Sequence, residues 1–296
     1  MLKLDGVSKV YRTGVFGGTA LTAVSDASFE VTPGQVLSLI GESGSGKTTI
    51  GRMILRLTDV TSGTITFDGA DVSSLGHRQL RGYYRHVQGI FQDPFSSYNP
   101  VFKVDRIFEM VRRAYLGGID GSEWKAKLRS SLEAVALEPA DVLGKYPHQL
   151  SGGQLQRLMI SRALMLDLRY LVADEIISML DASTRIDVLN LLGDLKGRGL
   201  GIVFITHDLS LGNYISDRTV ILRRGRIVEM GATPKVYGDP RHSYTRSLLA
   251  SVPQLHHKWG ATPGAGGEVV TASTGAGALV AVDDDHFVAA EEEVAA

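Results

Sequence analysis

The chain has 296 residues, of which 44% are apolar and 21% charged, the composition of a globular protein with a sizeable core. It contains no cysteine, which excludes disulfides, thiolate metal sites, cysteine nucleophiles and cysteine-ligated iron–sulfur clusters. Seven of the 32 acids follow Lys258 and no basic residue does, so residues 1–258 carry 31 basic against 25 acidic side chains. That mild excess is far from the basic stripe of a dedicated nucleic-acid binder, and we expect no nucleic-acid partner.

Hydrophobic periodicity predicts the elements in chain order. The first part should hold strands over Leu2–Val10, Ala27–Val31, Val36–Ile40 and Thr64–Phe67, with a helix over Thr48–Leu57. Helical spacing follows over Val104–Tyr115 and Glu123–Val135. The last part should hold strands over Tyr170–Ala173, Gly201–Thr206, Thr219–Leu222 and Arg226–Glu229, with a helix over 182–196. This order predicts an α/β core interrupted by a helical insertion.

The first chemical motif lies between the apolar run that ends at Ile40 and the helix that follows it. Gly41-Glu-Ser-Gly-Ser-Gly46-Lys47-Thr48 has the glycine, lysine and hydroxyl spacing of a phosphate-binding loop. Such a loop turns successive N–H groups and a helix N-terminus toward phosphate oxygens. Lys47 should reach the β- and γ-phosphates and the Thr48 hydroxyl should bind Mg²⁺. The predicted nucleotide-binding residues here are Gly41, Ser43, Gly44, Ser45, Gly46, Lys47, Thr48 and Thr49. The alternative is a Gly/Ser-rich surface turn.

Two acids end a later apolar strand. Asp174 and Glu175 directly follow Tyr170–Ala173. A carboxylate at a strand tip that faces a phosphate loop can hold Mg²⁺, which is the role expected of Asp174. Glu175 can orient and deprotonate an attacking water. The alternative is an ordinary acidic turn after a core strand.

Kinases, GTPases, helicases and transport ATPases all carry a phosphate loop, so other motifs must separate these classes.

The segment Leu150-Ser-Gly-Gly-Gln154 separates them. A serine and two glycines that open a helix over Leu155–Leu166 form a second anion site, with free N–H groups, a hydroxyl and a helix dipole. The segment resembles the signature motif of the ATP-binding cassette (ABC) ATPases. The resemblance implies that Ser151, Gly152, Gly153 and Gln154 contact the ATP of an opposing subunit, so that two cassettes close head to tail around two ATPs.

Four other positions match the same family. The resemblance implies that Tyr11 stacks on adenine, that Gln92 reaches Mg²⁺ and the attacking water, and that His207 contacts the γ-phosphate. Asp181 lies in a segment that resembles the loop joining the two nucleotide sites. Tyr11 could instead be an ordinary aromatic residue of a strand. His207 could instead be a structural histidine at the end of a strand. One departure is Ile176-Ile177, which replaces the proline and small residue common after the two acids.

The resemblance covers about residues 1–255 and implies the fold. We expect a P-loop NTPase ABC cassette with a RecA-like α/β core, an antiparallel β part and an inserted helical subdomain. The predicted boundaries are 1–93 and 166–237 for the core, 94–165 for the helical (signature) subdomain, and 238–255 for a C-terminal extension. A groove for a cytoplasmic helix of a membrane permease should lie near Gln92–Asn99.

The C-terminal extension narrows the family. Residues 240–253, with His242-Ser-Tyr244-Thr245, resemble the extension of dipeptide and oligopeptide importer ATPases, whose pattern runs His-Pro-Tyr-Thr. The resemblance implies an ATP-hydrolysing subunit that works with Mg²⁺ and energises a binding-protein-dependent importer. One alternative is that this segment is an amphipathic C-terminal helix that does not indicate an importer. The same role for oligosaccharides or nickel is another, and a soluble ABC ATPase acting on nucleic acid is a third.

The subfamily resemblance also implies the partners: a second, different ABC ATPase, two integral membrane permease subunits and an extracytoplasmic substrate-binding protein. No stretch approaches about 18 consecutive apolar residues and the first residues lack a signal peptide's apolar run. We therefore expect a peripheral protein at the cytoplasmic face of the membrane. The acidic, Gly/Ala-rich residues 256–296 lack sustained periodicity and are expected to be largely disordered, and deletion of residues 260–296 should leave ATPase activity nearly unchanged.

Overall fold

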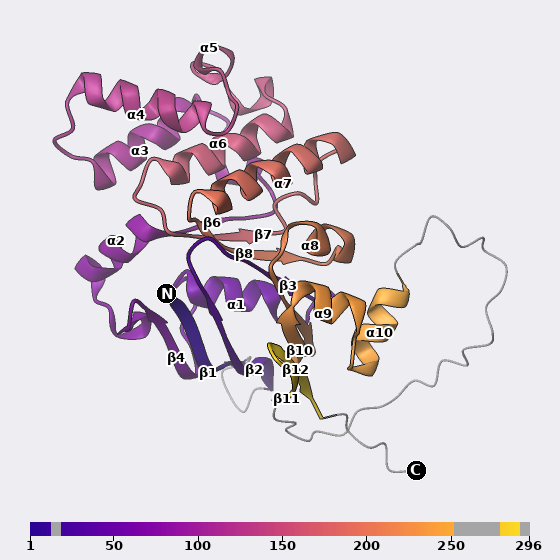
Figure 1. Cartoon of the computed structure of the whole chain (residues 1–296). Helices are drawn as coiled ribbons and strands as arrows, with labels where there is room; N and C mark the ends of the chain where they lie inside the picture. The colour runs from indigo at the N-terminus through magenta and orange to yellow at the C-terminus, as the bar shows by residue number, and fades with distance from the viewer. Residues whose placement is uncertain (13–18, 252–278, 291–296) are drawn as a thin grey trace.

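The computed structural model describes residues 1–12, 19–251 and 279–290, shown as a ribbon in Figure 1. The strands are β1 (Leu2–Arg12), β2 (Ala20–Val31), β3 (Val36–Ile40), β4 (Ser62–Phe67), β5 (Ala70–Asp71), β6 (Val87–Ile90), β7 (Tyr170–Asp174), β8 (Gly201–Thr206), β9 (Arg218–Arg223), β10 (Arg226–Ala232), β11 (Leu279–Asp283) and β12 (His286–Ala289). They form two sheets, of four strands and of eight.

The helices lie between the strands, and α3 to α6 follow one another between β6 and β7. They are α1 (Lys47–Ile54), α2 (His77–His86), α3 (Asp105–Tyr115), α4 (Gly121–Glu133), α5 (Pro139–Val142), α6 (Gly152–Leu164), α7 (Ala182–Gly197), α8 (Leu209–Ile215), α9 (Thr233–Gly238) and α10 (Ser243–Ala250), with short 3-10 turns at Val72–Ser74, Phe95–Ser97 and Pro147–Gln149. Among the described residues, none of these helices is long and apolar enough to cross a membrane.

The eight-stranded sheet runs in the order β11-β12-β10-β9-β3-β8-β7-β6. From β9 to β6 its neighbours are parallel, whereas β10, β12 and β11 are added antiparallel. Because β3, β7 and β8 are buried along their whole length, their sequences are continuous apolar runs rather than alternating ones. The carboxyl ends of β3, β6, β7 and β8 share one edge, where the polar residues predicted from the sequence follow.

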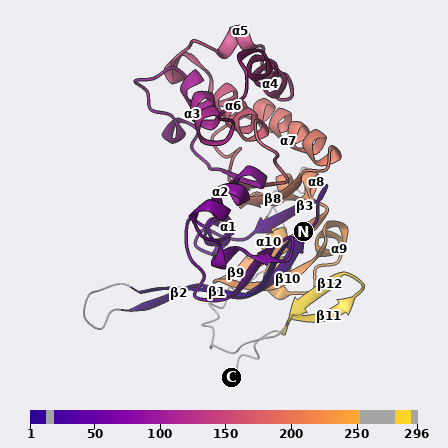
Figure 2. The ribbon, with the colours of Figure 1, turned by 90° about the vertical axis from the view of Figure 1, so that its left-hand side faces the viewer.

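The two faces of this sheet pack into different cores. In β8, Ile202 and Phe204 join the core formed with α3, α4, α6 and α7, whereas Val203 and Ile205 join the core formed with α1 and the four-stranded sheet. Figure 2 shows the helical subdomain on one side of the sheet and β1, β2 and α1 on the other. The alternation follows from the two-residue period of a strand. The helical subdomain and the antiparallel part predicted from the sequence are therefore confirmed.

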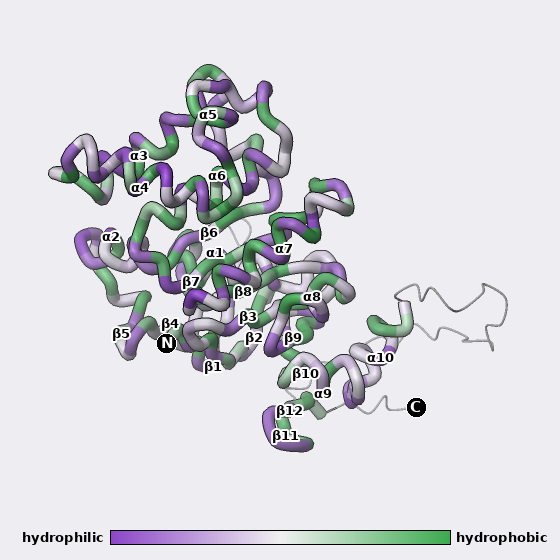
Figure 3. Tube along the Cα trace, turned by 45° about the horizontal axis from the view of Figure 1, so that its top comes forward, coloured by the Kyte–Doolittle hydropathy of each residue, from purple (hydrophilic) through white to green (hydrophobic). Residues whose placement is uncertain are grey.

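The helices of the helical subdomain are amphipathic. In Figure 3, α3 and α4 change between hydrophobic and hydrophilic colour along their length. Their buried faces carry Phe108, Val111, Trp124 and Leu132, which pack into the core shared with α6. Phe108 and Val111 are three residues apart, and Trp124 and Leu132 are eight apart with the partly buried Leu128 between them, which is the helical spacing that predicted both helices.

The main correction concerns the C-terminal tail. Residues 256–296 were expected to be largely disordered, but 279–289 form the β11–β12 hairpin, and β12 pairs with β10. His286, Val288 and Ala289 are buried there. This part of the tail therefore has an apolar face, which was not expected from the sequence. Residues 252–278 and 291–296, the rest of that prediction, lie outside the described residues.

Candidate nucleotide site

Two glycines in residues 41–48 are required by close backbone contacts. A Cβ atom on Gly41 would lie 2.1 Å from the carbonyl oxygen of Leu222 on β9. One on Gly46, whose φ is +103°, would lie 2.5 Å from the carbonyl oxygen of Ala23 on β2. Any side chain at either position would push the loop away from these strands. The glycines that the motif predicts therefore let the loop turn against both sheets before α1 begins.

Lys47 is held inside the turn of this loop. Its ammonium nitrogen Nζ donates to the carbonyl oxygens of Gly41 at 2.7 Å and of Glu42 at 2.8 Å. Only 5% of the residue is exposed. Burial lowers the pKa of Lys47, while nearby carboxylates, first Glu175 and then Asp174, act in the opposite direction. A cation enclosed by backbone carbonyls in this way is positioned for an anion that enters the loop.

Thr48 and Asp174 meet although 126 residues separate them in the chain. The Thr48 hydroxyl donates to Asp174 Oδ1 at 3.2 Å. Burial raises the pKa of the Asp174 carboxyl, and the hydrogen bond from Thr48 opposes that change. One hydroxyl and one carboxylate are the hard oxygen donors that Mg²⁺ prefers, so this pair fits the ion that the phosphate-loop motif implies.

Glu175 and His207 also come together, at the ends of neighbouring strands. Glu175 Oε1 lies 3.2 Å from His207 Nδ1. The backbone N–H of Glu175 donates to the carbonyl of Ile205 on β8, and its φ of +51° turns the chain sharply after β7. The Glu175 side chain is 22% exposed and that of His207 is 60% exposed, so water reaches both. Gln92 follows β6, which neighbours β7, and is exposed at the same edge.

The two isoleucines after Glu175 anchor this turn. Ile176 and Ile177 are 1% and 2% exposed and pack into the core shared with α6 and α7. The Ser178 hydroxyl donates to the carbonyl of Glu175 at 2.9 Å and closes the turn. Ile176 stands where the family commonly has proline. In this chain the turn is held by the burial of Ile176 and Ile177 and by the hydrogen bond from Ser178, rather than by a rigid proline ring.

The signature segment forms a reciprocal helix cap. The Gln154 N–H donates to Ser151 Oγ at 3.2 Å, and the Ser151 N–H donates to Gln154 Oε1 at 3.0 Å. A Cβ on Gly153 would lie 2.5 Å from Thr184 Cγ2, so α6 and α7 touch at this position. Asp181 caps α7 through Thr184, and hydrogen bonds from Ser183 and then Thr184 lower the pKa of that aspartate.

Within one chain the signature segment and the phosphate loop are apart. α6 packs on the sheet face that carries the helical subdomain, and α1 packs on the opposite face, as Figures 1 and 2 both show. Ser151 and Gly152 therefore do not complete the pocket of Lys47 in the same molecule. Tyr11 lies nearer to the loop: it pairs with Leu21 on β2, two residues from Ala23, whose carbonyl crowds Gly46.

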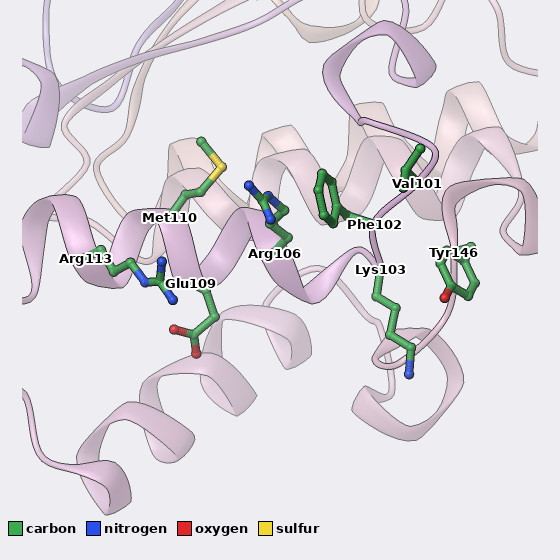
Figure 4. A pocket seen from close by; sticks show the side chains of 8 residues that line it. All are labelled: Val101, Phe102, Lys103, Arg106, Glu109, Met110, Arg113 and Tyr146. Atoms are coloured by element: carbon green, nitrogen blue, oxygen red, sulfur yellow. The ribbon is translucent and has the colours of Figure 1, made fainter.

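A groove of about 420 Å³ lies on the helical subdomain. Its walls are Val101, Phe102 and Lys103 before α3, four residues of α3 and Tyr146, as Figure 4 shows. Val101 is 73% exposed and Met110 61%, and the guanidinium of Arg106 lies 3.7 Å from the Phe102 ring centroid. The groove begins two residues beyond the segment Gln92–Asn99, where a permease contact was predicted.

Comparisons with known proteins place the chain. The family model described as ABC transporter matches residues 24–178, and the oligopeptide/dipeptide transporter C-terminal region matches 228–277. A putative peptide import ATP-binding protein of Brucella ovis is 44% identical over 255 residues, which are 86% of this chain and 78% of that protein. The oligopeptide transport ATP-binding protein OppF of Streptococcus mutans is 40% identical over 255 residues, 86% and 82% of the two chains.

A solved structure shares the fold. It is a dimeric ATP-binding cassette in a post-hydrolysis state with ADP and phosphate, similar with a TM-score of 0.69 and 27% identity over 79% of this chain and 99% of that one. Both the local chemistry of the strand-end residues and these similarities lead to one assignment. The chain belongs to the ABC transporter family, as an ATP-hydrolysing cassette that carries the oligopeptide/dipeptide transporter C-terminal region.

Proposed function

We propose that this chain energises a peptide importer by hydrolysing ATP at the cytoplasmic face of the membrane. The observation that carries the proposal is the pairing of Thr48 with Asp174 and of Glu175 with His207 beside the phosphate loop. The cargo class is supported by the relatives, which are named for peptide import and for oligopeptide transport, and by the matching C-terminal region.

The proposed roles follow from these positions. Lys47 exchanges its two carbonyl partners for the β- and γ-phosphates of ATP, and the loop N–H groups hold the remaining phosphate oxygens. Thr48, Asp174 and Gln92 would hold Mg²⁺, which neutralises phosphate charge when bound. Glu175 orients the attacking water and accepts its proton. His207 holds Glu175 in place and contacts the γ-phosphate.

The separation of α6 from the phosphate loop supports a two-cassette arrangement. We propose that Ser151, Gly152, Gly153 and Gln154 face the ATP of a second, different cassette, whose own signature segment completes the site at Lys47. Asp181, at the start of α7 beside Gly153, joins the two sites. Tyr11 contributes a ring for adenine from the β1–β2 hairpin.

The groove beside α3 is the proposed permease contact. Exposed apolar side chains such as Val101 and Met110, flanked by Arg106 and Arg113, suit a short amphipathic helix with acidic ends. With two permease subunits and an extracytoplasmic binding protein, the assembly would import peptides. No nucleic acid is part of this proposal.

Uptake measurements test the cargo. Cells that lack this gene should lose uptake of labelled di- and oligopeptides, and the wild-type gene should restore it, whereas Lys47→Ala should not. Loss of oligosaccharide or nickel uptake, with peptide uptake unchanged, would contradict the peptide assignment and keep the importer role. Purification of the tagged chain with nucleic acid instead of two integral membrane proteins would contradict both.

A further inference from the structure

The peptide group between Gly41 and Glu42 is held from both sides. Its carbonyl accepts the 2.7 Å hydrogen bond from Lys47 Nζ. Its N–H donates to the hydroxyl of Tyr244 at 3.4 Å. Rotation of this peptide plane would therefore break one contact with the phosphate-binding lysine and one with α10. Tyr244 lies 202 residues from the loop in sequence, in the extension that follows the core.

Tyr244 is itself fixed by its surroundings. Only 8% of the residue is exposed, and it packs in a cluster with Ile40, which directly precedes the loop, and Val228 on β10. The guanidinium of Arg223 lies 4.9 Å from the centroid of its ring. Burial raises the pKa of Tyr244, and the carboxylate of Glu42 also contributes to the rise, so the hydroxyl stays protonated at neutral pH.

The start of α10 depends on a buried carboxylate. Glu229 on β10 is fully buried, and its two oxygens accept the backbone N–H groups of Arg241 at 2.8 Å and His242 at 3.0 Å. His242 Nδ1 then accepts the N–H of Tyr244 at 3.0 Å and caps α10. Glu229 thus fixes the turn that directs Tyr244 to the loop.

The C-terminal hairpin supplies a further partner of this carboxylate. His286 Nε2 lies 2.7 Å from Glu229 Oε1, with only 3% of the His286 side chain exposed. The register places His286 opposite Gly231 and diagonally from Glu229 on the same face of the sheet. A Cβ on Gly231 would lie 2.4 Å from the carbonyl of Asp285, so the close approach of β12 needs this glycine.

Two ion pairs hold the hairpin against the core. Arg218 on β9 pairs with Asp285 at 2.5 Å, and Lys235 on α9 pairs with Asp283 at 2.8 Å. A buried carboxylate is costly unless each of its oxygens is satisfied, so Glu229 and the hairpin stabilise each other. Asp283 and Asp285 therefore bind this chain's own core.

We propose that the C-terminal hairpin positions the phosphate-binding loop, with His286 holding Glu229, Glu229 holding the turn before α10, and Tyr244 holding the Gly41–Glu42 peptide. Tyr244 and His286 are positioning residues that set ATP affinity. This inference rests on the proposed function of the loop in binding ATP.

Equilibrium binding of Mg–ATP to the full-length chain tests the proposal, together with kcat and KM of the assembled complex and thermal unfolding of the chain. Tyr244→Phe removes the hydroxyl that accepts the Glu42 N–H and keeps the ring, so Kd and KM should rise about two- to tenfold. The midpoint of thermal unfolding and kcat at saturating ATP should stay close to those of the wild type. Asp284→Asn, an exposed change in the hairpin turn, is the matched control and should alter none of these values.

The hairpin is tested by a double-mutant cycle. His286→Leu keeps volume but removes the partner of Glu229, and it should weaken Mg–ATP binding as Tyr244→Phe does. His286→Gln, whose amide nitrogen can reach the same position as Nε2, should restore binding. The double variant His286→Leu/Tyr244→Phe should bind as weakly as Tyr244→Phe alone, because both changes act through one hydroxyl.

Three results would overturn the inference: an unchanged Kd in Tyr244→Phe, full additivity in the double variant, or a lower unfolding midpoint in His286→Leu with an unchanged Kd. If His286→Leu does not fold, the Kd values of Tyr244→Phe and His286→Gln for Mg–ATP, compared with that of the wild type, still test the inference. Failure of the wild-type chain to bind Mg–ATP would refute the proposed function instead.

Discussion

Replacing Glu175 with Gln isolates one step of the proposed chemistry. The amide has nearly the same size and keeps an oxygen within reach of His207, which lies 3.2 Å from the carboxylate. The turn should survive, because it is held by the backbone of Glu175 at Ile205 and by the buried Ile177, not by the carboxylate. ATP should still bind, since Lys47 and Thr48 are untouched. Only the proton acceptor for the attacking water is lost.

The expected loss is the value of a general base. Hydrolysis at this chain's own site should fall by about 10²–10⁴-fold, which corresponds to about 3–5 kcal/mol of transition-state stabilisation. The assay is single-turnover hydrolysis by the assembled complex, with Mg–ATP binding measured separately. Lys47→Ala is the matched comparison, because it should weaken binding itself. Wild-type single-turnover hydrolysis by the Glu175→Gln complex would refute the assigned role of the carboxylate.

Three further changes test other parts of the argument. Ile177→Ala should lower the free energy of unfolding by about 2–5 kcal/mol, because it opens a cavity in a core where this side chain is 2% exposed. Chemical denaturation measures this change, and a loss below about 1 kcal/mol would show that the side chain does not anchor the turn. Asp174→Asn should raise the unfolding midpoint of the nucleotide-free chain, since it removes a buried negative charge, and should abolish Mg²⁺-dependent hydrolysis; a lower midpoint in calorimetry would contradict the cost assigned to that charge. Met110→Asp should prevent co-purification with the permease subunits and leave Mg–ATP binding unchanged, and an intact complex would exclude the groove beside α3 as the contact.

The motifs could be read from the sequence because their chemistry is local. The loop after Ile40 needs glycine, lysine and threonine at fixed spacing, and β3 before it is a buried strand that reads as an apolar run. The signature segment is a helix cap whose donors and acceptors lie within four residues of each other. The family assignment made from these motifs is confirmed by the matching models and relatives. The individual roles of the site residues remain predictions.

The pairings between distant segments could not be read in this way. The motifs led us to expect Thr48 and Asp174 at one Mg²⁺ site, but the direct hydrogen bond between them depends on the parallel order β3-β8-β7. Ile176 and Ile177 read as a departure from the family, and only their burial shows that they anchor the turn. Short helices such as α8 and α9 were also missed, because six or seven residues give too little periodicity to detect.

The C-terminal hairpin shows most clearly the difference between what the sequence predicts and what only the tertiary structure decides. The hairpin residues 279–289 are mostly apolar around three aspartates, but they lie within residues 256–296, whose Gly/Ala-rich and acidic composition as a whole favours disorder. Its strand partner β10 lies more than 50 residues earlier, and Asp285 and Asp283 form ion pairs with Arg218 and Lys235 on other elements. The sequence by itself determined the loop, the signature cap and the central strands, because neighbouring residues create them. The tertiary structure decided the pairings, the burial of Glu229 and the place of Tyr244, because these depend on which distant segments the sheet order makes neighbours.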